Sequence, residues 1–198
     1  MGSQETRNGH PSGMTLLELM VVVMILGVVM LTLMGIALST TRLHGKTSRL
    51  AGVQMSARQG MALMETEIRQ AGADPGNPPL GVIGIASAQA NLLRVRANLD
   101  GNAVLTTTEP SEDVIYSYNA GTRSILRNPG TGAQVLVPNV ESMVFSYFDG
   151  TNALITPLPL SATDAARVRS VGLTITAMDA DSMAITLSTR IALRNMGI

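Results

Sequence analysis

The sequence predicts an α+β protein in which one long N-terminal helix packs on a C-terminal antiparallel β-sheet domain. Three observations lead to this prediction: an uncharged apolar run at 19–38, an amphipathic pattern that continues to about residue 71, and short alternating segments after residue 91. Apolar residues spaced by three and four positions indicate a helix, whereas apolar residues at every second position indicate strands. The helix should therefore have an apolar half and an amphipathic half.

The apolar half has the length of a membrane span. From Leu19 to Leu38 no charged residue occurs, and about 20 helical residues cover roughly 30 Å, the thickness of the hydrocarbon core of a bilayer. Glu18 stands at the entrance of this run. A charge at the centre of such a helix costs about 2.5–3.5 kcal/mol on insertion scales, and the cost falls toward the end. Glu18 is therefore predicted to have a function and a cationic partner.

The residues before Glu18 suggest that partner. Cleavage between Gly13 and Met14 would create an amino group four residues before Glu18. An amine and a carboxylate on adjacent chains could neutralise each other where the dielectric constant is low. Gly13 followed by Met-Thr-Leu-Leu-Glu-Leu-Met-Val-Val-Val resembles the prepilin cleavage and methylation motif of type IV pilins and type II secretion pseudopilins. The likeness covers Gly13 to about Leu38, with Met14 standing where phenylalanine is usual.

The resemblance implies a processing site, a location and a set of partners. Gly13 and Met14 would flank the cleaved bond, Met14 would be N-methylated, and Glu18 would serve subunit assembly. The partners would be other minor and major pilins or pseudopilins, a prepilin peptidase and an inner-membrane assembly platform. The protein would cross the bacterial inner membrane once, with its C-terminal domain in the periplasm, and then enter a filament at the cell surface. The expected division is leader 1–13, transmembrane half 14–41, amphipathic half 42–72 and β-rich pilin domain 73–198.

The N-terminus has two other interpretations, a secretory signal peptide and a plain signal anchor. A secretory signal peptide has an apolar core of about 7–15 residues followed by a small-residue cleavage site, but this run is longer and is followed by the poor site Ala37-Leu38-Ser39. A plain signal anchor leaves Glu18 unexplained. The positive-inside rule opposes the prepilin interpretation, because the leader has only Arg7 whereas Arg42, Lys46 and Arg49 follow the span. The motif is the more specific of the two signals.

The amphipathic half carries two patterns. An apolar stripe recurs at helical spacing and predicts the face that covers the sheet. A row of small residues recurs at every fourth position and is predicted to lie roughly opposite that stripe. Such a row either allows close packing of neighbouring subunits or is an exposed polar face. The stripe consists of Leu43, Leu50, Val53, Ala57, Met61, Met64 and Ile68, and the small-residue row consists of Ser48, Gly52, Ser56 and Gly60.

The sequence after the helix predicts antiparallel strands joined by turns. Asn119-Ala120-Gly121 and Asp179-Ala180-Asp181-Ser182 are turn signals between β-rich segments. Alternation such as Val171, Leu173 and Ile175 predicts a sheet with one covered face. Long loops are expected at about 97–113 and 149–166. The expected strands are 92–96, 114–118, 124–127, 134–137, 140–148, 168–178 and 183–193.

Composition and motifs give no sign of catalysis. Lys and Arg number 14, as do Asp and Glu, and cysteine is absent, so charge does not favour nucleic acid and no disulfide is possible. Neither His10 nor His44 belongs to a known catalytic or metal motif. Asp179 with Asp181, and Glu112 with Asp113, could suggest calcium, but neither pair follows a calcium-loop pattern. Turn formation is the better interpretation of the aspartates, and neither cofactor, metal nor enzymatic activity is expected.

Two function hypotheses remain. The first is a minor pilin or pseudopilin that primes or caps a type IV pilus or a type II secretion pseudopilus. The second is a membrane-tethered binding or adhesion module that does not polymerise, and Glu18 beside a cleavable Gly13–Met14 bond argues against it. Several blocks resemble W-type (PilW-like) minor pilins, with J-type type II secretion pseudopilins sharing much of the pattern. They are Glu67–Gly72, Val114–Tyr118, Ile125–Arg127, Val140–Tyr147 with Asp149-Gly150, and Thr189–Asn195.

Overall fold

The computed structural model describes residues 14–76, 78–102 and 111–196, with side chains described throughout except at 41–47. The predicted leader 1–13 lies outside the described residues. The chain forms two compact units, and the boundary falls between Lys46 and Thr47. Helix α1 (Leu16–Gln70) contributes its N-terminal part to the first unit and its C-terminal part to the second.

In the first unit α1 is apolar and unburied. Residues Leu16–Thr40 have a mean hydropathy of 2.8 over their most apolar window, and none of that window is buried within the chain. Their length and composition suffice to cross a membrane. The prediction of a long apolar helix at the N-terminus is therefore confirmed.

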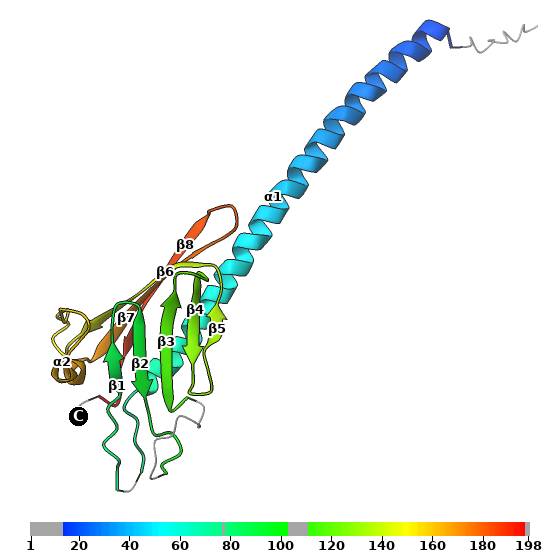
Figure 1. Ribbon diagram of the computed structural model, residues 1–198. Coiled ribbons are helices and arrows are strands. Elements are labelled where there is room, and N and C mark those ends of the chain that lie inside the picture. The colour runs from blue at the N-terminus through cyan, green and yellow to red at the C-terminus, as the bar shows by residue number, and fades with distance from the viewer. Residues whose placement is uncertain (1–13, 77, 103–110, 197–198) are drawn as a thin grey trace, which may run out of the picture. The chain divides into compact units, whose positions relative to one another are not determined.

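The second unit contains two antiparallel sheets (Figure 1). The strand order of the first is β1-β2-β3-β4-β5 and that of the second is β6-β7-β8. A short helix, α2 (Ala162–Arg167), lies between β6 and β7 in the chain. The strands are β1 (Ile85–Ala88), β2 (Leu92–Arg96), β3 (Asp113–Asn119), β4 (Ser124–Asn128), β5 (Gln134–Val137), β6 (Val140–Phe148), β7 (Ser170–Met178) and β8 (Ala184–Ala192). The predicted α+β class and antiparallel pairing are confirmed.

The structure differs from the sequence prediction in three details. The strands form two sheets rather than one, and the break falls at Pro138, which lacks a backbone N–H for pairing, and Asn139, whose φ is 58°. β1 was not predicted, because its sequence Ile-Ala-Ser-Ala has little β-propensity. The predicted loop 149–166 contains most of α2, whose N-cap Ser161 accepts a hydrogen bond from the backbone N–H of Asp164 at 3.1 Å.

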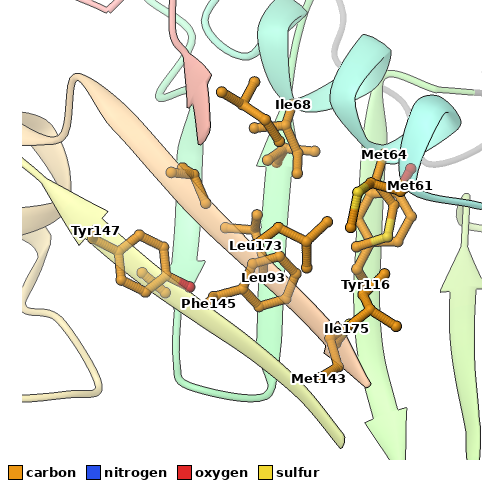
Figure 2. Close-up of a cluster of buried hydrophobic side chains, with 14 of the residues drawn as sticks. Met61, Met64, Ile68, Leu93, Tyr116, Met143, Phe145, Tyr147, Leu173 and Ile175 are labelled. Carbon is orange, nitrogen blue, oxygen red and sulfur yellow. The ribbon is translucent and has the colours of Figure 1, made fainter. Parts of the chain in front are cut away.

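One apolar core joins α1 to both sheets. Figure 2 shows Met61, Met64 and Ile68 of α1 packed beside side chains from the five-stranded and the three-stranded sheet. The predicted stripe on α1 is confirmed from Ala57 onward, where its members are buried, while Leu50 and Val53 are half-buried. The Leu43 side chain lies outside the described residues. Fully buried sheet residues in this core include Leu93, Tyr116, Phe145, Tyr147, Leu173 and Ile175.

Helix α1 ends where the chain makes a close backbone contact. Gly72 has a φ of +79°, and its N–H donates to the carbonyl of Arg96 at 2.9 Å. A Cβ on Gly84 would lie 2.6 Å from the backbone nitrogen of Gly72, so the segment before β1 can approach the helix end only without a side chain. Gly72 thus ends the helix with a positive φ, and Gly84 allows the close contact with it.

The small-residue row does not stay on one face of the helix. Each step of four residues advances about 400°, which is roughly 40° more than one turn, so the row rotates by about 120° between Ser48 and Gly60. Gly60 is consequently buried, and a Cβ there would clash with Cγ2 of Val137 on β5. Gly52 is exposed, and a Cβ there would meet nothing within 4 Å. The expectation that the whole row lies opposite the apolar stripe is wrong for Gly60.

These two glycines form a matched pair for a stability test. Gly52→Ala should stabilise the protein by about 0.5–1 kcal/mol, because alanine favours the helix and the space is open. Gly60→Ala should destabilise it by about 1–3 kcal/mol through overpacking against Val137. Urea unfolding of the full-length protein in detergent, followed by circular dichroism, measures both. Equal effects of the two changes would contradict the packing described for Gly60.

Candidate functional site

The first turn of α1 holds Glu18 in a capping box. Thr15 precedes the helix, and its carbonyl accepts the N–H of Leu19 at 3.1 Å, so Thr15 is the N-cap. The Thr15 hydroxyl accepts the backbone N–H of Glu18 at 3.3 Å, and the Thr15 backbone N–H donates to Oε2 of Glu18 at 3.2 Å. The Thr15 hydroxyl also lies 3.2 Å from Oε2. The pattern Thr-x-x-Glu thus satisfies two otherwise unpaired donors of the helix start.

The cap uses only one oxygen of the Glu18 carboxylate. In the part of the chain that the structure describes, Oε1 of Glu18 accepts no hydrogen bond. Met14 lies beside the cap with 65% of its surface exposed, while Gly13 lies outside the described residues. Sequence reasoning missed the part played by Thr15, although Thr-x-x-Glu before an apolar run is the signal for such a cap.

The comparison with protein families decides what kind of N-terminus this is. Residues 10–34 match the family described as the prokaryotic N-terminal methylation motif. This match supports a type IV pilin-like protein. The matched range contains Gly13, Met14 and Glu18, the three residues that the sequence singled out. No curated protein matches the chain.

The motif supports several general statements about the pilin-like chain. Its N-terminal segment has a helix compatible with a membrane anchor. Proteins with this motif are structural rather than enzymatic, and the motif implies processing by a prepilin peptidase and assembly with other pilins.

A second polar cluster joins α1 to the five-stranded sheet. Glu67 is only 6% exposed. Arg127 on β4 donates to its carboxylate from Nε at 3.1 Å and from Nη2 at 2.5 Å. Ser111 donates to Oε1 at 2.9 Å, and the hydroxyl of Tyr116 on β3 donates to Oε2. Every oxygen of this buried carboxylate is therefore paired, as a buried charge requires.

The electrostatics of this cluster are those of a fixed ion pair. Burial raises the pKa of Tyr116 far above its ordinary value, and the negative charge of Glu67 raises it further. The hydrogen bond to Glu67 raises the pKa of Arg127. Tyr116 thus stays protonated as a donor and Arg127 stays charged, so the cluster holds α1 on the sheet and offers no proton for catalysis.

Asp113 and Glu112, the second acidic pair that could suggest calcium, have structural partners. Asp113 binds Arg94 at 2.6 Å and Arg96 at 3.1 Å. Burial opposes ionisation of Asp113, but the hydrogen bond and charge of Arg94, together with Arg96, lower its pKa below the ordinary value. Oε1 of Glu112 accepts the N–H of Leu99 at 2.9 Å. Within the ranges that the structure describes, no three His, Cys, Asp or Glu side chains are grouped to hold a metal.

The Glu67–Arg127 pair can be tested by a double-mutant cycle. Glu67→Ala should destabilise the protein by about 3–5 kcal/mol, because it leaves the charge of Arg127 poorly compensated. Glu67→Ala combined with Arg127→Ala should cost much less than the sum of the two single changes, because the double variant leaves neither charge buried alone. Urea unfolding of the full-length protein measures each variant. Glu65→Ala is the control, since the described part of the chain gives that carboxylate no partner, and an equal loss there would contradict the assignment.

Proposed function

We propose that this pilin-like chain is a minor pilin or pseudopilin, a structural subunit that primes or caps a type IV pilus or a type II secretion pseudopilus. The observation that carries the proposal is Glu18 at the entrance of an apolar helix, five residues after Gly13 inside the methylation motif. Cleavage after Gly13 would leave the Met14 amine free to reach the unpaired Oε1 of Glu18 on a neighbouring chain. Such a pair is strong where water is excluded.

Location and partners follow from the same proposal. Residues Leu16–Thr40 would anchor the chain in the bacterial inner membrane, with the second unit in the periplasm until the subunit joins a filament at the cell surface. Its partners would be the major and the other minor pilins or pseudopilins, the prepilin peptidase and an inner-membrane assembly platform. The orientation rests on the motif, because the arginines and lysine after the span favour the opposite one.

A minor role is favoured over that of the repeating shaft subunit. The chain has no cysteine, so it cannot form the C-terminal disulfide loop that major pilins often carry. Several blocks also resemble W-type and J-type subunits, which act in small priming complexes. The alternative function, a membrane-tethered binding module that does not polymerise, would require neither cleavage at Gly13 nor Glu18.

The docking role of Glu18 can be separated from its capping role. Glu18→Gln keeps an oxygen for the Thr15 N–H but removes the charge, whereas Thr15→Val removes the capping hydroxyl and keeps the charge. If docking depends on the charge, Glu18→Gln should lower co-purification with partner pilins at least about tenfold, equivalent to roughly 1.4 kcal/mol. Thr15→Val should retain most of the co-purification with partner pilins, since a lost cap costs only about 0.5–2 kcal/mol of helix stability.

Two readouts complete this experiment. Mass spectrometry of protein from its native membrane should show that Met14 is the mature N-terminus. In the wild-type protein, Met14 should also be N-methylated. Normal co-purification of Glu18→Gln with partner subunits would overturn the docking role and leave Glu18 as a helix cap.

The minor role predicts low abundance. Quantitative proteomics of sheared filaments should find this chain far below the major subunit, and deletion should reduce the number of filaments or the secreted cargo without removing the major subunit from the membrane. If the chain were the most abundant filament protein, the minor-subunit proposal would be wrong and only the pilin class would stand.

A further inference from the structure

The three-stranded sheet ends at β8, a nine-residue strand that pairs on one side only (Figure 1). Its antiparallel register with β7 continues without a shift over nine residue pairs. A strand at the edge of a sheet presents a row of backbone N–H and C=O groups that have no partner within the sheet. The β8 edge is therefore a long, regular row of such groups.

The hydrogen bonds just beyond the two ends of β8 show which residues turn these groups outward. The N–H of Asp179 donates to the carbonyl of Met183 at 3.1 Å, and the N–H of Leu193 donates to the carbonyl of Arg169 at 2.9 Å. Because hydrogen-bonded and non-hydrogen-bonded pairs alternate in an antiparallel ladder, the odd-numbered residues of β8 bond to β7. The outward backbone groups, which accept and donate no hydrogen bond within the described residues, are those of Ala184, Thr186, Ser188, Arg190 and Ala192.

Both edges of the five-stranded sheet are short and interrupted. β5 has four residues, and Pro138 follows it directly. β1 also has four residues and contains a bulge, and the carbonyl of Ala88 at its end accepts the N–H of Leu160 at 2.9 Å. Short strands, proline and bulges are the usual means by which proteins prevent strand addition at an edge.

The other edge of the three-stranded sheet is covered by the chain itself. The N–H of Phe145 on β6 donates to the carbonyl of Ala90 at 2.7 Å, and the carbonyl of Tyr147 accepts the N–H of Ile155 at 2.9 Å. β6 also has a bulge near its start. Among the four sheet edges in the described chain, β8 is therefore the one that is both long and uncovered.

β8 also lacks the side chains that usually protect an edge. Its sequence, Ala-Ile-Thr-Leu-Ser-Thr-Arg-Ile-Ala, contains neither proline nor lysine. Nε of Arg190 donates to the hydroxyl of Ser170 at 2.9 Å, and the guanidinium lies 3.7 Å from the centre of the Phe148 ring. Ser170 is on β7 and Phe148 is on β6, so the single charge of β8 is held across the face of the sheet and away from the edge.

The side chains of β8 indicate which kind of strand fits beside it. Ile185 and Leu187 are half-buried on the core side, whereas Thr186 and Ser188 are exposed on the other side. An added strand with apolar side chains next to Ile185 and Leu187 would complete their burial, and hydroxyl side chains would suit the opposite face. The fitting segment is thus extended, with apolar residues at alternate positions.

A second copy of β8 does not meet these conditions. The turn before β8 lies against the start of the second unit's helical segment, since Ser182 and Ser56 line one groove, and Asn195 after β8 donates to the carbonyl of Gln70 at 3.4 Å. An antiparallel pair of β8 strands would therefore hold Thr47 of the two copies at opposite ends, whereas two copies anchored in one membrane need it at the same end. A parallel pair would place the half-buried side chains of the two copies on opposite faces of the joined sheet.

We propose that the β8 edge binds an extended segment of another protein, which adds to the three-stranded sheet as a fourth strand and has apolar side chains at alternate positions. In this mode of recognition, main-chain hydrogen bonds provide affinity and alternate side chains provide specificity. The proposal does not depend on the filament role. It rests on backbone groups of the second unit and, for the exclusion of a second copy, on the membrane anchor alone.

Binding of defined peptides to the full-length protein in detergent tests this proposal. The probe is a fluorescein-labelled, end-capped peptide, Lys-Thr-Val-Thr-Val-Ser-Val-Thr-Lys. One control peptide is N-methylated at its valines, and the other is N-methylated at its threonines and serine, so that side chains are kept while alternate N–H groups are removed. A strand that adds to an edge uses only alternate N–H groups, so one control should lose binding and the other should keep it.

Fluorescence anisotropy measures the three affinities. We expect a Kd below about 1 mM for the unmodified peptide, a loss of at least about tenfold for one control and a change within about threefold for the other. Loss at the threonines and serine would indicate antiparallel addition, and loss at the valines parallel addition, because residues opposite each other share a face. Equal affinities of the two controls, or no binding of the unmodified peptide at about 1 mM, would overturn the proposal.

Amide hydrogen exchange tests the edge without any substitution. In the free full-length protein, NMR should show fast exchange for the outward amides of Thr186 and Ser188 and slow exchange for those of Ile185 and Leu187, which bond to β7. Saturating peptide should slow the outward amides at least about tenfold. Outward amides that already exchange slowly in the free protein would show that the edge is covered, and the proposal would be wrong.

Two substitutions at one position locate the site. Ser188→Pro removes an outward N–H but no bond to β7, and proline is tolerated where the N–H of an edge strand faces solvent. It should weaken peptide binding at least about tenfold, whereas Ser188→Ala, which keeps the N–H, should bind as the parent does. Circular dichroism verifies the fold of each variant. Unchanged binding by folded Ser188→Pro, or a dimer of the free protein that this substitution dissociates in sedimentation, would contradict the proposal, and the dimer would identify a second copy as the occupant.

Discussion

The contact between α1 and the two sheets determines how the second unit is built. Neither sheet can bury its apolar face alone, and Met61, Met64 and Ile68 supply the surface that closes the core between them. Within this apolar contact, Glu67 places one charge that must be paired. Arg127 from β4 and Tyr116 from β3 meet it there. Because apolar burial is not directional and a buried ion pair has a defined geometry, Glu67 sets the register of α1 on the sheet.

Local periodicity explains why most of the fold could be predicted. The stripe from Ala57 to Ile68 and the alternation along β7 are properties of neighbouring residues, and the structure buries them as predicted. The division into two sheets was not predicted, because it depends on how Asn139 turns the chain after Pro138. β1 and α2 escaped prediction for a different reason. Ile-Ala-Ser-Ala is weakly β-forming, and six residues are too few to establish a helical period.

The candidate sites also differ in how well the sequence alone could predict them. Gly13, Met14 and Glu18 are adjacent in sequence, so a short motif could identify them, and the family comparison matches that range. The cluster around Glu67 could not be predicted, because its members come from positions 67, 111, 116 and 127 and meet only after β3 and β4 have paired. The burial of Asp179 is also a product of tertiary structure. Sequence identified the aspartate as a turn former, and the structure shows that the turn uses only one of its two oxygens.

Glu18 and Asp179 share a chemical property that links the two ends of the chain. Each carboxylate uses one oxygen to satisfy local backbone N–H groups, at a helix start in one case and in a hairpin turn in the other. Each second oxygen has no partner within the described chain. For a fully internal role, one would expect both oxygens to be paired, as they are in Glu67. The two carboxylates differ in access to solvent. Glu18 is exposed, so its second oxygen is open to a group outside the chain, and the cap holds the carboxylate in place. Oδ2 of Asp179, like Oε2 of Glu112, is buried and has no such access.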